Sequence, residues 1–226
     1  MKRSTELELI KRVLSHVAEK STDMADATSS LPVTRYYDPE RFEAEQKLIF
    51  GRLPRAIGHI SQIPETGDFF TLDAGDAPVL IVRTEGGGVN AFLNVCRHRG
   101  ARLEWDAGGC GRKRFTCKYH GWVYSPDGAL VGVPGSDGFP ELNRDLHGLS
   151  RLPVEVRHGF VWIHPDPGGA LDVADYLGPL DAELAGFDLA GHVQFSPRRF
   201  SKKINWKLVI DTFLEGYHVR TAHKDT

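Results

Sequence analysis

The sequence has few cysteines and no long apolar run, and each shortage excludes a class of protein. Three cysteines, Cys96, Cys110 and Cys117, occur in 226 residues. This small, odd number argues against a disulfide framework and leaves thiols available for metal or redox chemistry. No stretch approaches the ~20 apolar residues of a membrane span, and the N-terminus lacks the apolar core of a signal peptide. We therefore expect a cytoplasmic protein without a membrane segment.

An excess of positive charge is also lacking. Lys and Arg total 28 against 30 Asp and Glu, which gives a formal net charge of -2. Without a sustained basic run, neither nucleic acid nor an anionic membrane is an expected partner. The 41% hydrophobic content is ordinary for a globular chain, and this length is enough to bury the core of one large or two small domains.

The first half of the chain changes from helical to strand character. Apolar residues on one face predict a helix over residues 5–20, and Asp38 followed by Pro39 predicts the start of a second helix. From about residue 53, short apolar runs alternate with Gly, Pro and Asp turns, as in an antiparallel β domain. These runs cover residues 68–72, 79–82, 91–95, 122–124, 129–131 and 160–163.

The last third is predicted to open another domain. Glycines and prolines after Pro165 indicate a linker, residues 192–200 have the pattern of a strand, and Asn205 is a suitable N-cap for a helix that continues towards His218.

Two short segments each carry one cysteine and one histidine. Cys96 and His98 stand in CRHRG, and Cys117 and His120 stand in CKYHGW. Each pair offers a thiolate and an imidazole on one tight loop. A Rieske 2Fe-2S cluster uses this arrangement, because one of its irons takes two thiolates and the other takes two imidazoles.

Other interpretations of these four residues are a zinc site or ordinary core side chains. A zinc finger pairs Cys with Cys and His with His, whereas each loop here offers one of each. A lone buried cysteine needs no metal, but two matched pairs favour a cluster. Cys110 has no counterpart in this pattern and is expected to be a free thiol.

The segment DTFLEGYHVRTAH carries a second group of candidate ligands. On a continuous helix Asp211, Glu215 and His218 would share one face. His223 could join His218 at one metal only if the helix broke near residues 219–221. Two histidines and a carboxylate form the facial triad of non-haem iron(II). The alternative is an amphipathic helix with exposed acidic residues and ordinary histidines.

Together, CRHRGARL, RFTCKYHGW and NWKLVIDTFLEGYHVRTAH resemble the large (alpha) terminal oxygenase subunit of the Rieske non-haem iron ring-hydroxylating oxygenases. The resemblance implies an α+β fold, with an antiparallel β Rieske domain inserted after N-terminal helices. The start of a helix-plus-sheet (helix-grip-like) catalytic domain follows. Residues 1–52 would be a helical segment of the catalytic domain, residues 53–165 the Rieske 2Fe-2S domain, and residues 166–226 the beginning of the mononuclear iron domain.

The same resemblance implies two cofactors, a Rieske 2Fe-2S cluster and a mononuclear Fe(II). Their implied ligands are Cys96, His98, Cys117 and His120 for the cluster, and His218 and His223 for the mononuclear iron. Glu215 would be an electron bridge between subunits of a homotrimer, contacting His218 of its own chain and His120 of a neighbour. The family supplies a third, carboxylate iron ligand far downstream, so we expect this chain, which stops at Thr226, to be truncated before that ligand.

The implied activity is that of an oxygenase fed by a reductase or ferredoxin that depends on NAD(P)H. Electrons would pass from the cluster to the iron, which activates dioxygen to hydroxylate or oxidatively demethylate a small organic substrate. Glu215 replaces the Asp of the ring-dioxygenase branch and is similar to the branch acting on carnitine, betaine and other quaternary ammonium compounds. The substrate is therefore expected to be aromatic or a quaternary ammonium compound. The alternative is a Rieske-type electron-transfer module without oxygenase activity, especially for a truncated chain.

Overall fold

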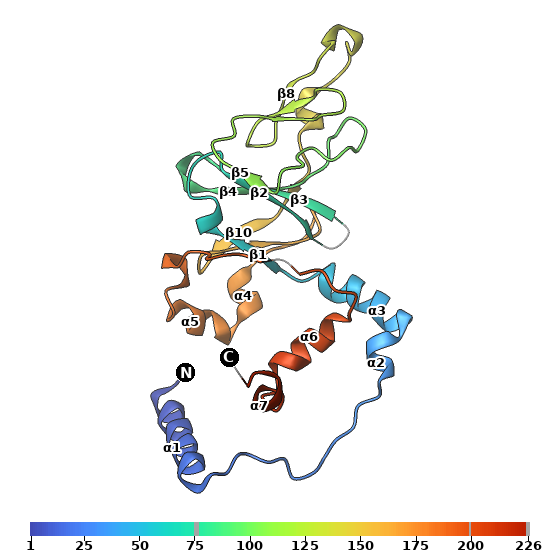
Figure 1. The fold of residues 1–226 in the computed structure, drawn as a ribbon. Coiled ribbons are helices and arrows are strands. Elements are labelled where there is room, and N and C mark those ends of the chain that lie inside the picture. The colour runs from blue at the N-terminus through green and yellow to red at the C-terminus, as the bar shows by residue number, and fades with distance from the viewer. Residues whose placement is uncertain (75–76, 199, 225–226) are drawn as a thin grey trace. The chain divides into compact units, whose positions relative to one another are not determined.

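The computed structural model describes residues 1–74, 77–198 and 200–224, which divide into two compact units (Figure 1). The first unit joins residues 1–42 to the C-terminal segment that starts at Ser201, and the second runs from Glu43 to Phe200. The first unit contains α1 (Arg3–Glu19), α2 (Thr34–Tyr37), α6 (Trp206–Phe213) and α7 (Val219–Ala222). The helix α3 (Pro39–Glu45) and the π-helical turn at Gln46–Phe50 lead from one unit to the next. The domain boundaries expected at residues 52 and 165 remain a prediction.

Three antiparallel sheets form the second unit. The first has the order β1-β11-β10, with β1 at Arg55–His59, β10 at Val154–Arg157 and β11 at Phe160–Ile163. The second has the order β5-β2-β3-β4-β9, with β2 at Phe69–Ala74, β3 at Ala77–Arg83, β4 at Val89–Leu93, β5 at Gly108–Gly109 and β9 at Arg151–Leu152. The third has the order β6-β7-β8, with β6 at Phe115–Thr116, β7 at Val123–Tyr124 and β8 at Leu130–Gly132. A turn at residues 126–128 joins β7 to β8, and Ser125 N–H donates to the Ala129 carbonyl across it.

Two apolar clusters hold these sheets together. Strand β3 faces both of them, because alternate residues of a strand point to opposite sides. Leu80 and Val82 belong to the cluster shared with the third sheet, and Val79 and Ile81 belong to the cluster shared with the first. Cys96 and Cys117 lie in the first of these clusters, among aromatic side chains. The buried core therefore extends directly beneath the two Cys/His loops.

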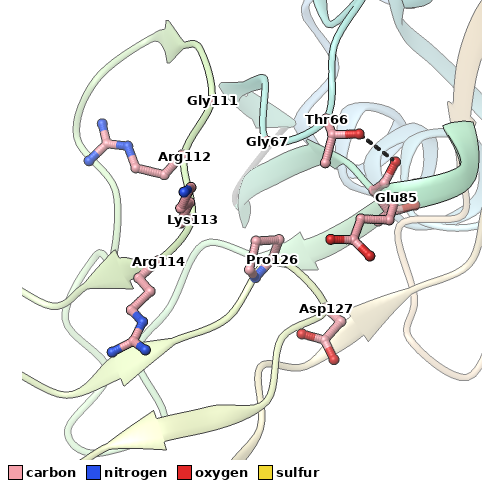
Figure 2. Close-up of a pocket in the computed structure, with 10 residues that line it drawn as sticks. Thr66, Gly67, Glu85, Gly111, Arg112, Lys113, Arg114, Pro126 and Asp127 are labelled. Carbon is pink, nitrogen blue, oxygen red and sulfur yellow. Dashed lines mark hydrogen bonds between the residues drawn. The ribbon is translucent and has the colours of Figure 1, made fainter.

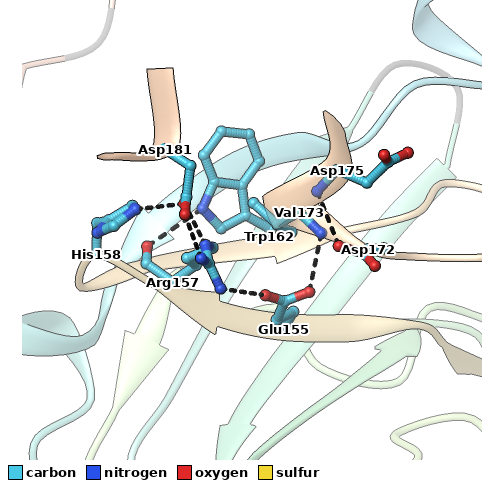
Figure 3. Close-up of polar contacts among 8 residues, drawn as sticks. All are labelled: Glu155, Arg157, His158, Trp162, Asp172, Val173, Asp175 and Asp181. Atoms are coloured by element: carbon cyan, nitrogen blue, oxygen red, sulfur yellow. Dashed lines mark hydrogen bonds and ion pairs between the residues drawn. The ribbon is translucent and has the colours of Figure 1, made fainter. Parts of the chain in front are cut away.

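Two helices, α4 (Val173–Leu177) and α5 (Pro179–Ala185), are tied to the hairpin of β10 and β11 by the polar contacts in Figure 3. The guanidinium of Arg157 donates two hydrogen bonds to the carboxylate of Asp181, and His158 Nε2 lies 2.7 Å from the same group. Glu155 Oε2 accepts from the N–H of Val173 at 3.0 Å. Asp172 caps α4 by accepting from the N–H of Asp175 at 2.9 Å.

The α+β fold class is confirmed, but several local predictions are wrong. Helices α4 and α5 occupy part of the expected linker, and residues 192–198 and 200 form neither helix nor strand. Residue 199 of that expected strand lies outside the described residues. Helix α1 is present, yet none of its residues is buried. No helix in the described part of the chain is both long and apolar enough to cross a membrane.

Candidate metal centres

The first Cys/His loop is a closed turn that begins and ends at the sheet. Cys96 N–H donates to the Ala101 carbonyl at 2.8 Å, and Gly100 N–H donates to the Cys96 carbonyl at 3.0 Å. Gly100 has φ +73°, a left-handed conformation that glycine adopts without strain. At the base of the loop, buried Asn94 exchanges two hydrogen bonds with the backbone of Glu104, at 2.7 and 2.8 Å.

The second loop repeats the same backbone pattern. Cys117 N–H donates to the Trp122 carbonyl at 2.8 Å, Gly121 N–H donates to the Cys117 carbonyl at 2.9 Å, and Gly121 also has φ +73°. Both loops therefore hold their cysteine at the base and their histidine near the turn. The extra residue between Cys117 and His120 is accommodated without changing these two hydrogen bonds.

The two loops bring together the four residues predicted as cluster ligands. The ring centroids of His98 and His120 are 4.5 Å apart, and His98 stacks on the buried indole of Trp122 at 4.8 Å. Cys96 and Cys117 are 3% and 2% exposed, whereas the side chain of His120 is exposed. Two thiols thus lie on the core side of the site and two imidazoles on its outer side.

These residues fit a Rieske cluster in their donor chemistry. Nδ1 of His98 is one of two buried side-chain nitrogen or oxygen atoms without a hydrogen-bond partner among the described residues, and a metal bond would satisfy it. Burial lowers the pKa of His98, to which the charges of His120 and Arg99 add. The neutral imidazole, which is the form that binds metal, is therefore favoured.

Cys96 has an environment in which a free thiolate would be costly. Burial raises the pKa of Cys96, although hydrogen bonds from Tyr124 and from the His98 backbone oppose the effect. The Tyr124 hydroxyl lies 3.4 Å from Cys96 Sγ and accepts from the Arg97 N–H at 3.0 Å. Since a bound ferric ion stabilises thiolate strongly, a metal would offset the cost that burial imposes.

Glu215, His218 and His223 lie in one exposed segment of the first unit. The Glu215 carboxylate contacts Nδ1 of His218, and its Oε2 accepts from the backbone N–H of Tyr217 at 2.6 Å and of His218 at 3.2 Å. The hydrogen bond with His218 lowers the pKa of Glu215. A carboxylate on Nδ1 keeps the proton there and leaves Nε2 as the lone pair for a metal. The His218 and His223 ring centroids are 5.4 Å apart.

The prediction of a continuous helix through this segment is wrong. Helix α6 ends at Phe213, and the predicted break at residues 219–221 is instead the short helix α7. The break comes earlier, at residues 214–218, where the Glu215 carboxylate takes the N–H groups that a helix would use. Asp211 does not share a face with His218; it accepts a 2.6 Å hydrogen bond from the Tyr36 hydroxyl.

Within the described residues, no three His, Cys, Asp or Glu side chains gather around one possible ion position. A Rieske cluster does not need such a group, because each iron takes only two protein ligands. For the mononuclear site, this means that the described chain brings two histidines together and adds no carboxylate as a third ligand.

Several residues that support the cluster site were not singled out from the sequence. Tyr124 contacts Cys96, Trp122 stacks on His98, and Phe139 packs edge-on against both rings, with centroid separations of 6.3 and 6.4 Å. Trp122 directly follows CKYHG, so its closeness to the ligands could have been predicted from the sequence. Phe139 comes from a loop that has no local pattern, so nothing pointed to it.

Two known families match the parts of the chain that carry these residues. Residues 54–144 match the Rieske [2Fe-2S] domain, and residues 188–226 match the catalytic domain of the ring hydroxylating alpha subunit. The chain is 37% identical to the glycine betaine monooxygenase oxygenase subunit of Chromohalobacter salexigens, over 87% of this chain and 43% of the relative. It is 36% identical to biphenyl 2,3-dioxygenase subunit alpha of Rhodococcus jostii, over 87% and 44%. The chain thus spans less than half the length of these curated relatives.

Solved structures give the same result. The quaternary ammonium Rieske monooxygenase CntA superimposes with a TM-score of 0.79 at 27% identity, covering 88% of this chain and 56% of that one. Naphthalene 1,2-dioxygenase superimposes with a TM-score of 0.73 at 36% identity, covering 81% and 42%. Because the family matches, the relatives and the fold agree, this chain belongs to the Rieske oxygenase alpha subunits, with a Rieske 2Fe-2S domain and part of the ring-hydroxylating, iron-binding catalytic domain.

Proposed function

We propose that the protein is the terminal component of a Rieske oxygenase system, which receives electrons at a 2Fe-2S cluster and delivers them to a mononuclear iron. Cys96 and Cys117 would hold one iron of the cluster, and His98 and His120 the other. His218 and His223 would hold the mononuclear iron. The observation that carries the proposal is the pairing of two loops with matching backbone hydrogen bonds, which places two buried thiols beneath two adjacent imidazoles.

The cluster would supply one-electron storage, and the mononuclear iron would bind and activate dioxygen. This chain's residues orient and insulate those groups. Trp122 stacks on one face of His98, and Phe139 lies edge-on to the same ring. Tyr124 donates towards Cys96 from a side chain that is 0% exposed. An apolar, closed surrounding of this kind limits solvent access and helps to set the redox potential.

Glu215 is the residue that we propose as the link between the two centres. It already holds Nδ1 of His218, and its carboxylate is exposed enough to meet a second partner. In a homotrimer that partner would be His120 of a neighbouring subunit, which is also exposed. A single carboxylate could then connect an imidazole of the cluster to an imidazole of the iron site.

The proposed substrate is a small organic molecule that is hydroxylated or oxidatively demethylated. Glu215 favours a quaternary ammonium compound, and the similarity to a glycine betaine monooxygenase subunit and to CntA supports that choice. The similarity to biphenyl and naphthalene dioxygenases keeps aromatic substrates as the second candidate. The electron donor would be a reductase or ferredoxin supplied by NAD(P)H.

The test is low-temperature EPR with iron and sulfide analysis on the anaerobically reconstituted and reduced chain. We expect a Rieske-type signal with about two irons and two sulfides per chain for the cluster, and additional ferrous iron where the second site is filled. A chain with the cluster but without further iron would act only as an electron-transfer module. Zinc in place of a cluster would refute the proposal.

Substitutions of the proposed cluster ligands test the ligand assignment against a cysteine that is not a ligand. Cys96→Ser and His120→Ala should each abolish the cluster and its brown colour, because each removes a ligand. Cys110→Ser is the control, since Cys110 is exposed and lies in neither ligand loop. A fully coloured Cys96 variant would show that the ligand assignment is wrong.

A further inference from the structure

A cleft lies within the predicted Rieske domain, at the opposite end of β6 and β7 from the ligand loop at residues 117–121. It has a volume of about 860 Å³, and its lining includes Glu85, Arg112, Lys113, Arg114 and Asp127. Figure 2 shows Arg112, Lys113 and Arg114 on one wall and Glu85 and Asp127 on the other, with the side chains of Arg112 and Arg114 extending away from the acidic pair. No residue of the loops at 96–100 and 117–121 lines it.

The topology of the third sheet fixes the position of this cleft. Strand β6 runs from the basic wall to Cys117, and β7 returns from the ligand loop to the turn that contains Pro126 and Asp127. Arg114 and Asp127 therefore flank one end of these strands, and the ligand loop lies at the other. With a rise of ~3.3 Å per residue, Arg114 is only about 10 Å from Cys117 along the chain.

The start of the basic wall is hydrogen-bonded to the neighbouring backbone and packs against the core that contains the cysteines. Arg112 N–H donates to the Gly67 carbonyl at 2.7 Å, and Gly111 N–H donates to buried Asp68 at 3.0 Å. The Arg112 guanidinium lies 5.0 Å from the ring centroid of Phe69, whose ring packs edge-on against Phe115 at 5.4 Å. Phe69 and Phe115 belong to the same buried cluster as Cys96 and Cys117.

The charge of this wall is largely uncompensated. Arg112 forms ion pairs with Glu104 and Asp106 at 3.5 and 3.4 Å. Lys113 and Arg114 are exposed and take part in no ion pair among the described residues. Lys113 and Arg114 thus place two cations side by side, unpaired within the described residues, on a chain whose net charge is -2, and such a pair favours an acidic partner and speeds its approach.

We propose that this cleft is the docking surface for the acidic iron-sulfur protein that reduces the cluster. The inference rests on the proposed function. In the proposed function, the imidazoles are turned towards the mononuclear iron of a neighbouring subunit. The electron donor therefore needs a different surface of the Rieske domain, and the cleft offers one that begins three residues before the thiolate ligand Cys117. The step transfers one electron: the donor's reduced cluster is oxidised by one unit and the Rieske cluster is reduced by one. The acidic wall at Glu85 and Asp127 would repel a wrongly rotated partner and so fix its orientation.

The test uses the reconstituted chain and an acidic plant-type 2Fe-2S ferredoxin as the probe, whose potential lies well below that of a Rieske cluster. The variant Lys113→Glu with Arg114→Glu reverses the basic wall and leaves Arg112 in place. The control variant Lys47→Glu with Arg52→Glu makes the same charge change at two exposed residues of the same unit, outside the cleft. Binding is measured by biolayer interferometry, and cluster reduction by stopped-flow absorbance.

At low ionic strength we expect the cleft variant to bind the reduced ferredoxin at least ~10-fold more weakly and to be reduced at least ~10-fold more slowly, as for loss of electrostatic steering. The difference should shrink as salt screens the charges. The neutral variant Lys113→Gln with Arg114→Gln should have an affinity and a reduction rate between those of the parent and those of the charge-reversed cleft variant. Equal effects of the cleft and control variants would overturn the docking proposal.

The cluster content of each variant distinguishes a failure of the proposed function from a failure of the docking proposal. EPR and reduction by a small photoreductant report whether the cluster is present and reducible without a docked protein. A parent chain without any Rieske signal would refute the proposed function itself. A normal signal in all variants, with identical ferredoxin kinetics, would refute only the assignment of the cleft.

Discussion

The substitution Tyr124→Phe tests the proposed cluster at a single hydrogen bond. The Tyr124 side chain is 0% exposed, and its hydroxyl lies 3.4 Å from Cys96 Sγ. Phenylalanine keeps the ring that fills the core and removes the hydroxyl, which is both the donor towards Cys96 and the acceptor for the Arg97 N–H. The added electron increases the negative charge on the sulfur ligands, so a donor near Cys96 stabilises the reduced cluster more than the oxidised one. Removing it should therefore lower the reduction potential.

The size of the effect follows from the energy of one hydrogen bond. A hydrogen bond to a charged group contributes about 1.5–3 kcal/mol, and only the part that differs between the two redox states changes the potential. We take that part as about 1 kcal/mol. For one electron, about 1.4 kcal/mol corresponds to ~59 mV, so the reduction potential should fall by ~40 mV. The Arg97 N–H also loses its acceptor, which should cost about 1 kcal/mol of unfolding free energy.

The assay is a redox titration followed by circular dichroism or EPR. Tyr176→Phe makes the same chemical change on α4, where the tyrosine is 44% exposed, and should leave the potential at the parent value. A Tyr124→Phe potential equal to or above that of the parent, in a protein with full cluster content, would show that the hydroxyl does not act on the cluster sulfur.

Three further predictions concern the supporting contacts. Hydrogen bonds from its basic partners hold the pKa of Asp181 well below its usual value, so Asp181→Asn should lower the melting temperature at neutral pH. The loss should shrink progressively as the pH falls below about 4, where the carboxylate of the unfolded chain begins to protonate, and vanish only below the depressed pKa of Asp181 in the folded protein. Asp175→Asn, at an exposed position, should show no such pH-dependent loss. Tyr36→Phe should speed hydrogen exchange in α6, while Tyr37→Phe, at a 69% exposed residue, should not. Glu215→Gln should leave both metal contents unchanged and slow electron transfer between the centres, as measured by rapid-freeze EPR; loss of the cluster would contradict the bridging role.

The strands and the cluster loops were predictable because their signals are local. Residues 79–82 form an apolar run between turns, and β3 was found there. Likewise, Cys96 and His98 are two residues apart, so any tight turn brings their side chains to the same place. The spacing of the ligands within each loop thus carries most of the information about the site.

The features that could not be predicted depend on contacts between distant parts of the chain. Tyr36 and Asp211 are 175 residues apart in sequence, and their hydrogen bond directs Asp211 away from the predicted ligand face. The end of α6 has a different origin. The apolar pattern favours a longer helix, but the Glu215 carboxylate competes for the backbone N–H groups of the next turn. Helix periodicity alone does not include that competition.

The two candidate centres therefore differ in how firmly the chain supports them. The cysteines of the cluster site are held by a buried core and by backbone hydrogen bonds on both sides of each loop. In the iron site, His218 is the last residue of the break at residues 214–218, and His223 follows α7. Their alignment depends on Glu215 and on α6, whose two ends are hydrogen-bonded to Tyr36 through Asn205 and Asp211. Because sites that lack a buried framework open at lower free energy, removal of the mononuclear iron should loosen residues 214–223 and leave the cluster domain folded. Hydrogen exchange with and without ferrous iron would show this difference directly, and equal protection of the 214–223 segment in both samples would contradict it.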